Sequence, residues 1–318
     1  MTVRDERLRL ADRGRDITVR SARPVPLDPP RNAGELPRYL RALRRLADAD
    51  DLAAAYAGCT LARDVAARED DQAGLATVYS QRSSVARRLG ELPAAQRDAE
   101  AAAALPPLPP GAAALLTSRR VAVHLDRGEI DQAERLMTDA ELPDEPEYLL
   151  LRYVRGRLHL EAGRPGEALA DLYRCGERLA VRGSDHPAVL PWRSAAAEVL
   201  AQLGAGEAAE RLLAEEIALT RRHGLASALG RALRVQGRVT AGPAGLAAAE
   251  EAVRILHGTP RRFELATALV DLGALLNAAR RRPQARRILR DGLELAQKCG
   301  SPALVERAQQ LVRGRTTR

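Results

Sequence analysis

Large aromatic side chains are scarce in this sequence: they make up 3% of its 318 residues, with one tryptophan and one phenylalanine. β-Branched and aromatic residues never gather in an alternating run, which argues against a sheet as the main framework. Alanine and leucine dominate instead. This composition predicts an all-α protein in which small side chains let the helices approach one another closely.

Long hydrophobic runs are missing too. No stretch approaches the roughly 18 consecutive apolar residues of a membrane span, and residues 1–20 are charged without an apolar centre. The three cysteines, Cys59, Cys175 and Cys299, lie far apart and form no C-x-x-C pair. We therefore expect a cytoplasmic protein with reduced thiols and no membrane or secretory segment.

Lysine is almost absent: of the 50 basic residues, only Lys298 is a lysine. The formal net charge of +8 suggests a nucleic-acid partner at first sight. The arginines, however, alternate with 42 acidic residues, which is typical of solvated helix faces. We expect no specific nucleic-acid binding by this chain alone.

Patterns for catalysis and metal binding are also lacking. None of the five histidines pairs with another His, Cys or Glu at metal-ligand spacing on a helix face. Ser83, Ser84 and Ser118 have no nearby His or Asp that would activate a nucleophile. We predict no catalytic residue, no metal site and no cofactor.

The sequence does contain a short motif that recurs about every 38 residues. Each copy joins a turn to small residues, as in Gly90-Glu91-Leu92-Pro93-Ala94-Ala95. A turn residue lets one helix end, and a small residue early in the next lets the two helices approach closely. Fixed-period recurrence of this kind predicts a helical-repeat solenoid. The last alanines of the motifs, at intervals of 40, 38, 35, 41, 38 and 38 residues, are Ala55, Ala95, Ala133, Ala168, Ala209, Ala247 and Ala285.

These motifs predict one elongated domain. We expect a polar, Pro- and Arg-rich tail over residues 1–33, a superhelix of about seven helix pairs over 34–314, and a short tail over 315–318. The last helix of the superhelix, near 302–313, would cap the stack. Within it, the third pair should end with a helix over 129–140, and the fifth should begin with one over 187–203.

Repeats four, five and seven carry a more specific pattern. Its segments are Arg155-Gly156-Arg157-Leu158, Ala168-Leu169-Ala170-Asp171-Leu172, His186-Pro187-Ala188-Val189-Leu190-Pro191-Trp192-Arg193-Ser194, Ala268-Leu269-Val270-Asp271-Leu272-Gly273 and Leu293-Glu294-Leu295-Ala296-Gln297-Lys298-Cys299-Gly300. Together they resemble the repeat region of actinomycete large ATP-binding LuxR-type transcription regulators, closely over 147–313 and more weakly over 35–146. The resemblance implies a tetratricopeptide-like fold and a role as the regulator's sensor and interaction arm.

The modules that flank this region in the family are missing here. A Walker A loop needs Gly-Lys-Ser/Thr, but Lys298 is followed by Cys299. A LuxR-type helix-turn-helix needs several helices, and 18 residues follow Gly300. We therefore expect either an excised sensor arm or a stand-alone protein that kept only that arm.

Three charged residues fall on or beside packed faces of the repeats: Arg155, Asp171 and Arg193. They could form an anion or ligand site, or a structural network that holds repeats four and five in register. We favour the structural interpretation. For Trp192, we favour a place in the core over stacking on a ligand.

In tetratricopeptide-type stacks the first helix of each pair lines the concave face. Counting back from the motif alanines predicts polar side chains there, including Gln236 in repeat six. Any one of them could simply be wet surface, but their mixed charge in repeats two to five indicates a groove for a peptide or polar metabolite. The candidate binding residues are Arg87, Arg88, Tyr153, Arg157, Glu161, Ser194, Glu198 and Gln202.

These observations predict a non-catalytic repeat domain that binds a protein partner or a small-molecule effector in its concave groove. The alternative is a regulator-derived repeat protein repurposed as an enzyme or substrate-binding chaperone in a biosynthetic pathway. The identity of the ligand, the target genes and the formation of a homo-oligomer are left open.

Overall fold

The computed structural model describes residues 27–137, 142–183 and 185–314. Within these ranges the regular elements are fifteen α-helices and two short 3-10 helices, η1 (Ala33–Glu35) and η2 (Pro146–Tyr148), without a strand. This confirms the predicted all-α architecture of seven helix pairs and a cap. The α-helices are α1 (Leu36–Asp48), α2 (Leu52–Arg68), α3 (Gln72–Leu89), α4 (Leu92–Ala103), α5 (Pro110–Arg127), α6 (Ile130–Leu136), α7 (Leu149–Glu161), α8 (Pro165–Val181), α9 (Trp192–Gln202), α10 (Gly206–Arg222), α11 (Ala226–Val239), α12 (Gly242–His257), α13 (Arg262–Ala278), α14 (Arg282–Cys299) and α15 (Pro302–Val312).

A small residue occupies the fourth position of the second helix in every pair. In six pairs it is the motif alanine, and each of these alanines is fully buried. In the sixth pair α12 begins at Gly242, so the fourth residue is Gly245, and the predicted Ala247 is exposed. An added Cβ on Gly245 would lie 3.0 Å from the carbonyl oxygen of Gly237 on α11. The predicted register was therefore two residues late in this repeat.

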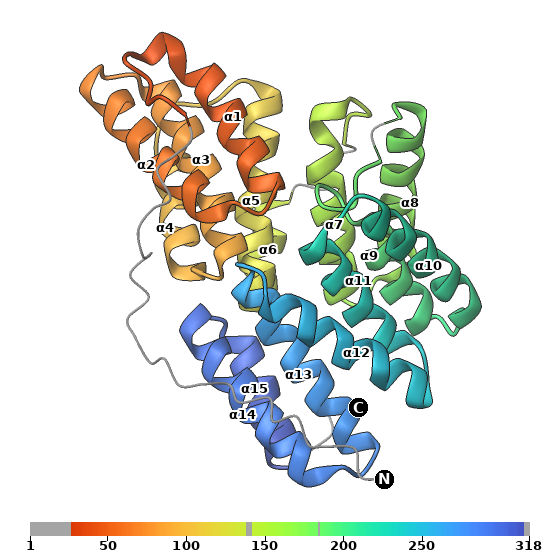
Figure 1. The fold of residues 1–318 in the computed structure, drawn as a ribbon. Helices are drawn as coiled ribbons and strands as arrows, with labels where there is room; N and C mark the ends of the chain where they lie inside the picture. Colours follow the sequence, from red (N-terminus) through yellow and green to blue (C-terminus); the bar gives the residue numbers. More distant parts are fainter. Residues whose placement is uncertain (1–26, 138–141, 184, 315–318) are drawn as a thin grey trace.

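The helices form an inner and an outer layer. Each helix packs against its neighbours in sequence, and α1, α3, α5, α7, α9, α11, α13 and α15 also contact one another in succession. Such repeated contact between the first helices of consecutive pairs places them on the inside of the curve, as expected for a repeat solenoid. Figure 1 shows the resulting curved arrangement.

The curve closes on itself. Helix α13 contacts α3, and α15 contacts α5, so the C-terminal repeat meets repeats two and three. In Figure 1 the blue helices thereby come beside the orange and yellow ones. Polar contacts fasten this closure: Arg261 Nε donates to Asp50 Oδ1 (2.8 Å), and Ser301 Oγ donates to the carbonyl oxygen of Asp126 (2.7 Å).

Two glycines at helix ends permit the close approach at this closure. Gly90 (φ +85°) ends α3 and Gly128 (φ +80°) ends α5, both in the left-handed conformation that favours glycine. An added Cβ on Gly90 would lie 2.9 Å from Cys299 Sγ, and one on Gly128 would collide with the Cβ of Ala303. Side chains of the C-terminal repeat can therefore pack directly against the backbone at Gly90 and Gly128, because neither glycine carries a Cβ.

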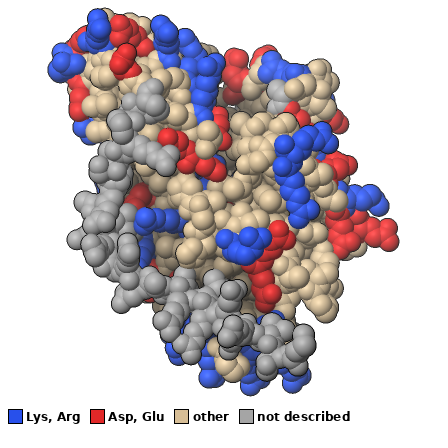
Figure 2. All heavy atoms as spheres, in the orientation of Figure 1, with Lys and Arg blue, Asp and Glu red and all other residues tan. Residues whose placement is uncertain are grey.

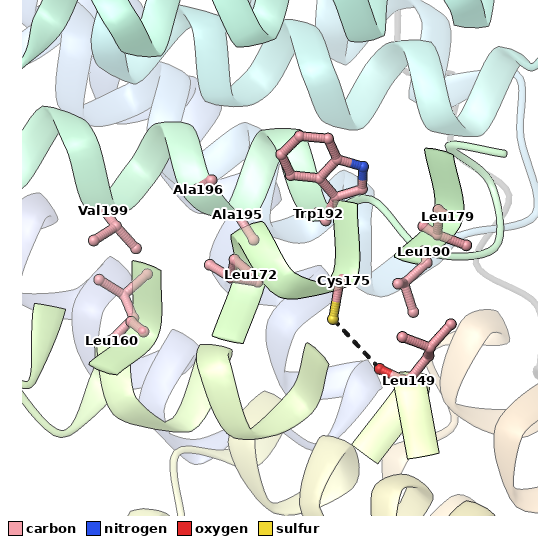
Figure 3. Close-up of a cluster of buried hydrophobic side chains, with 11 residues drawn as sticks. Leu149, Leu160, Leu172, Cys175, Leu179, Leu190, Trp192, Ala195, Ala196 and Val199 are labelled. Carbon is pink, nitrogen blue, oxygen red and sulfur yellow. Dashed lines mark hydrogen bonds between the residues drawn. The ribbon is translucent and has the colours of Figure 1, made fainter. Parts of the chain in front are cut away.

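Trp192 belongs to the core between α7, α8 and α9 (Figure 3). Its side chain lies against Gly176, where an added Cβ would be 2.6 Å from the indole ring. Tyr173 packs edge-on against the indole at a centroid distance of 6.2 Å. In the same core, Cys175 Sγ donates to the carbonyl oxygen of Leu149 (3.6 Å). The single tryptophan thus fills the contact between repeats four and five.

Two helix boundaries differ from the prediction. Helix α9 begins at Trp192 instead of residue 187, because Pro191 lacks an N–H donor and its ring would clash with the carbonyl four residues earlier in a helix. Helix α6 ends at Leu136; residues 138–140 of the predicted span lie outside the described residues. Of the predicted tails, residues 1–26 and 315–318 also lie outside them, while Leu27 packs against the core of the first repeat.

Charged side chains of both signs are mixed over the face seen in Figure 2. This matches the interpretation of the abundant arginines as parts of solvated helix faces. Among the helices in the described ranges, none combines the length and apolar character that a membrane span requires.

Candidate functional site in the central cavity

The inner helices enclose a cavity of about 700 Å³. This volume falls in the range of small-molecule binding sites. One position of the repeat reaches the wall of this cavity in each of the first six repeats. It lies on the first helix of the pair, eleven residues before the fourth residue of the second helix. In the first six repeats these wall residues are Arg44, Ser84, Ala122, Arg157, Glu198 and Arg234.

Most of the predicted concave residues do line this cavity. They are Arg87, Arg88, Tyr153, Arg157, Glu161, Ser194 and Glu198. Gln202 does not: it is the last residue of α9, is exposed, and lies beyond the cavity wall. Gln236 does not line the cavity either. Because the predicted register in repeat six was two residues late, Arg234 occupies the wall position that the prediction assigned to Gln236.

On the side of the cavity that the C-terminal repeats form, here called its C-terminal side, Arg234 is surrounded by carboxylates. Its Nη1 lies 2.9 Å from Asp271 Oδ2 and 3.5 Å from Glu198 Oε1, and its Nε lies 3.9 Å from Glu264 Oε1. Burial disfavours the charged guanidinium, but these three carboxylates outweigh burial and raise the pKa of Arg234. Three acids therefore balance the charge of this arginine, although its buried Nε makes no hydrogen bond within the described residues.

Asp271 joins helices of different repeats through its arginine partners. It accepts from Arg234 on α11 and Arg307 on α15, and its own side chain is 1% exposed. Burial would raise the pKa of this carboxyl, but Arg238, Arg307 and Arg234 together lower the pKa of Asp271 to about 2. The group is therefore an ionised structural link between the last two repeats and the capping helix.

On the N-terminal side, Arg88 has weaker compensation. Its Nη1 donates to the Ala47 carbonyl oxygen and to Asp48 Oδ1, both at 3.1 Å. Burial, followed by the nearby charge of Arg261, lowers the pKa of Arg88 to about 10 in spite of Asp48. Here one carboxylate does not balance the cost of burying the guanidinium.

Arg119 has still less compensation. Only 8% of the residue is exposed, and its Nη1 donates to the hydroxyl of Ser80 (2.6 Å). Among the described residues no carboxylate pairs with it, and its buried Nε has no hydrogen-bond partner. Burial and then the like charges of Arg44 and Arg88 lower the pKa of Arg119 to about 9. It is a buried cation in surroundings of the same sign.

Between these two sides, Arg87 and Arg157 share one acid. Arg87 Nη1 lies 2.6 Å from Asp126 Oδ2, and Arg157 Nη2 lies 3.2 Å from Asp126 Oδ1. The Asp126 side chain is 3% exposed, whereas both arginines are about one quarter exposed, at 28% and 27%. Tyr153 lies beside them, and burial raises the pKa of its phenol. Two arginines thus offer N–H groups towards the cavity while anchored to a common carboxylate.

Ser194 lies at the start of α9 above a buried acid. Its backbone N–H donates to Glu216 Oε2 (2.8 Å), and Glu216 is 1% exposed. Burial raises the pKa of the Glu216 carboxyl, although Arg231 lies 3.9 Å away and opposes that shift. The backbone of Ser194 is thus anchored to this acid.

The predicted structural network forms, but as two separate units. Arg155 binds Asp171 in a bidentate manner, with Nε–Oδ2 and Nη2–Oδ1 both at 2.7 Å. Arg193 does not join them: it pairs with Asp185 (2.6 Å) and Glu215 (3.1 Å). The Arg155–Asp171 pair therefore stabilises α7 against α8 inside repeat four and does not link repeats four and five. The Arg193 guanidinium instead lies over the Trp192 ring, 4.6 Å from its centroid.

The same bidentate arrangement occurs in repeat two. Arg82 donates through Nε to Asp98 Oδ2 (2.8 Å), again across a spacing of 16 residues. Both acids lie three residues after the buried alanine of their repeat, so the motif is a feature of the repeat geometry.

Across the part of the chain that the structure describes, no three His, Cys, Asp or Glu side chains cluster as metal ligands would. Burial raises the pKa values of the Cys59, Cys175 and Cys299 thiols, each to about 12. All three cysteines are buried and in the thiol form.

Sequence analysis missed several arginines of the wall. The missed residues are Arg119, Arg231, Arg234, Arg238, Arg261 and Arg307. Arg234 and Arg238 follow from the repeat pattern once the sixth repeat is counted from Gly245. Arg261 and Arg307 reach the cavity through the closure of the superhelix, for which the sequence carries no periodic signal.

A solved structure shares this architecture. A Rap protein complexed with competence and sporulation factor matches over 89% of this chain and 87% of its own, at 11% identity and a TM-score of 0.64. A tetratricopeptide repeat protein from Parabacteroides merdae covers 87% of this chain and 99% of its own, at 16% identity and a TM-score of 0.45. No family model and no curated protein matches the sequence. The chain thus has a tetratricopeptide-like helical-repeat fold.

Proposed function

We propose that this chain is a non-catalytic binding domain whose central cavity receives a segment of a protein partner or a small-molecule effector. The observation that carries the proposal is the cavity wall, to which nearly every inner helix contributes. It presents arginines, carboxylates and the phenol of Tyr153 around one cavity. Polar groups that converge on one cavity are what fix the orientation of a ligand in a binding site.

The Rap protein supports this proposal by analogy of fold. That protein has a factor bound to the same kind of superhelix. At 11% identity the likeness concerns architecture, so the ligand of this chain must be inferred from its own wall residues.

We also propose that the chain is the sensor or interaction arm of a cytoplasmic LuxR-type regulator, or a descendant of one. The support is the sequence resemblance over residues 147–313. Mechanistically, a ligand that touches both sides of the cavity would favour the closed superhelix over an open one. Closure would then be the signal that a partner reads.

The alternative is a substrate-binding chaperone or enzyme of a biosynthetic pathway. The contact of the C-terminal repeat with repeats two and three favours it, since a cavity with converging polar groups also suits a small substrate. Turnover of the bound molecule would separate the two functions.

Native mass spectrometry of the purified chain tests the proposal, because a retained ligand appears as added mass. Titration calorimetry with that ligand should then show weaker binding to Tyr153→Ala and Glu198→Gln. Gln202→Ala is the matched control, because Gln202 lies on the same helix as Glu198 but outside the wall. Equal affinity of all three variants and the wild type would contradict a site in the cavity.

A further inference from the structure

The N-terminal side of the cavity carries more positive charge than the protein neutralises. Ten arginines and six acidic residues line the cavity as a whole. The carboxylates gather around Arg234, Arg238, Arg87 and Arg157. The opposite side is left with an under-compensated set, which we call the arginine cluster: Arg44, Arg88 and Arg119.

The three members come from different repeats and converge on one place. Arg44 is on α1, Arg88 on α3 and Arg119 on α5, three helices that contact one another in succession, and all three side chains line the cavity. Among the described residues, the one carboxylate paired with the cluster is Asp48, on Arg88. Arg44 has no ion pair within the same ranges.

Arg119 makes this arrangement hard to explain as structural. A buried guanidinium normally requires a carboxylate, because an unpaired buried charge is strongly destabilising. Two other buried arginines of this protein follow that rule, Arg82 with Asp98 and Arg261 with Asp50. Arg119 has instead a serine hydroxyl and two arginines nearby.

We propose that the arginine cluster binds an anionic group, a carboxylate or a phosphate, carried by the ligand of the cavity. This inference rests on the proposed function and gives its ligand a chemical class. Planar guanidinium groups bind both anions through paired N–H donors, which is why arginine predominates at such sites. The carboxylates on the other side would at the same time repel a second negative charge and accept hydrogen bonds from neutral or cationic parts of the ligand.

Titration calorimetry with two probes tests the inference, using the whole chain at fixed ionic strength. Pyrophosphate represents the phosphate source and citrate the carboxylate source. We expect at least one of them to bind the wild type. Arg44→Gln and Arg119→Gln should each weaken that binding about tenfold or more, the equivalent of one charge-assisted hydrogen bond. Arg120→Gln is the matched control, because Arg120 follows Arg119 on α5 but lies outside the cavity wall.

The outcomes separate the sources. Binding of pyrophosphate alone assigns a phosphate, and binding of citrate alone assigns a carboxylate. Binding that is equally weakened by Arg120→Gln would show non-specific attraction to a basic chain and overturn the proposal. If neither probe binds while a ligand identified by mass spectrometry does, the cluster is not an anion site, although the cavity is still the binding site.

Thermal unfolding gives an independent readout that does not require a ligand. In buffer without multivalent anions, Arg119→Gln should raise the Tm, because it removes a buried charge that the protein leaves unpaired. Adding the bound probe should raise the Tm of the wild type but not that of the variant. Should Arg119→Gln fail to fold, the exposed Arg44 still allows the binding test. A lower Tm for a folded Arg119→Gln, with unchanged probe affinity, would show a structural role and overturn the proposal.

Discussion

Arg119 and Arg234 are both buried arginines on the wall of one cavity, yet their surroundings shift their pKa values in opposite directions. On the C-terminal side, three carboxylates raise the pKa of Arg234. On the N-terminal side, burial and like charges lower the pKa of Arg119 to about 9. Since both are buried, the difference lies in the acids supplied by neighbouring helices. Arginines join repeats on both sides of the cavity, but only on the C-terminal side do several carboxylates balance their charge.

The largest effect should come from removing the acid that joins the last repeats. Asp271→Ala would leave Arg234 without its nearest carboxylate and deprive Arg307 of its partner. Breaking a buried ion pair from one side typically costs about 3–5 kcal/mol, and with two partners we expect a value near the upper end. Chemical unfolding would measure it. The control is Glu294→Ala, whose ion pair with Lys298 is exposed and should contribute at most about 1 kcal/mol.

The same acid predicts a pH dependence. The pKa of Asp271 is lowered from 3.8 to about 2 on folding, so its contribution is present above pH 3.8 and is lost as the pH falls towards 2. The wild type should therefore lose stability in this window more steeply than Asp271→Ala. Parallel pH profiles of the two proteins would show that Asp271 is not the linked group.

A somewhat smaller loss is expected at Asp171, an equally compensated position outside the cavity. Asp171→Ala strands Arg155, but the Arg155 side chain is 19% exposed and can regain some hydration. We expect a cost of about 3 kcal/mol, the lower end for a buried pair. Glu177→Ala on the same helix, where the ion pair is exposed, is the control for thermal unfolding. An unchanged Tm for Asp171→Ala would remove the structural role of the pair.

The two sides belong to one cavity only while the superhelix is closed. A substitution at Gly128, where α5 meets the C-terminal repeat, tests this closure. Gly128→Ala adds a Cβ that collides with Ala303 and must also adopt a positive φ. Gly163→Ala imposes a similar backbone conformation (φ +73°) with no heavy atom within 4 Å of the new Cβ. The difference in unfolding free energy between the two variants should be about 1–3 kcal/mol, the cost of overpacking. Small-angle scattering should show a larger radius for Gly128→Ala alone; equal behaviour would mean that the closure is not tight.

The sequence predicts those parts of the fold whose signals are local, that is, carried by residues close together in the chain. The motif alanines lie at the contacts between paired helices, so their period located six of seven pairs in register. The exception, Gly245, shows the limit: both glycine and alanine satisfy the close approach, and a run of small residues from Gly242 to Ala249 does not mark which one is buried. As a result, the prediction placed Gln236 at the wall position that Arg234 occupies in the structure.

The candidate site was predictable only where it follows the repeat. Tyr153, Arg157 and Glu198 lie at recurring positions of first helices, and counting from the motif finds them. Arg261 reaches the wall because the superhelix closes, which depends on the summed rotation of seven pairs. Small differences in helix length and packing accumulate in that sum, and no single segment of sequence encodes it. The lack of a carboxylate beside Arg119 is likewise a property of the assembled wall.

The smallest effect on stability is expected for Arg157→Ala. Arg157 lies between the two sides of the cavity, and its partner Asp126 also accepts from Arg87. The variant therefore leaves the buried carboxylate paired, and we expect a loss of about 1 kcal/mol or less. The double variant Arg87→Ala/Arg157→Ala strands Asp126 and should cost more than the two single changes together, a non-additivity that a double-mutant cycle measures directly. Strict additivity would mean that each arginine is held independently of the other. If the loss at Arg157 alone is small while the affinity for the cavity ligand falls about tenfold or more, the charge of Arg157 serves binding rather than the fold.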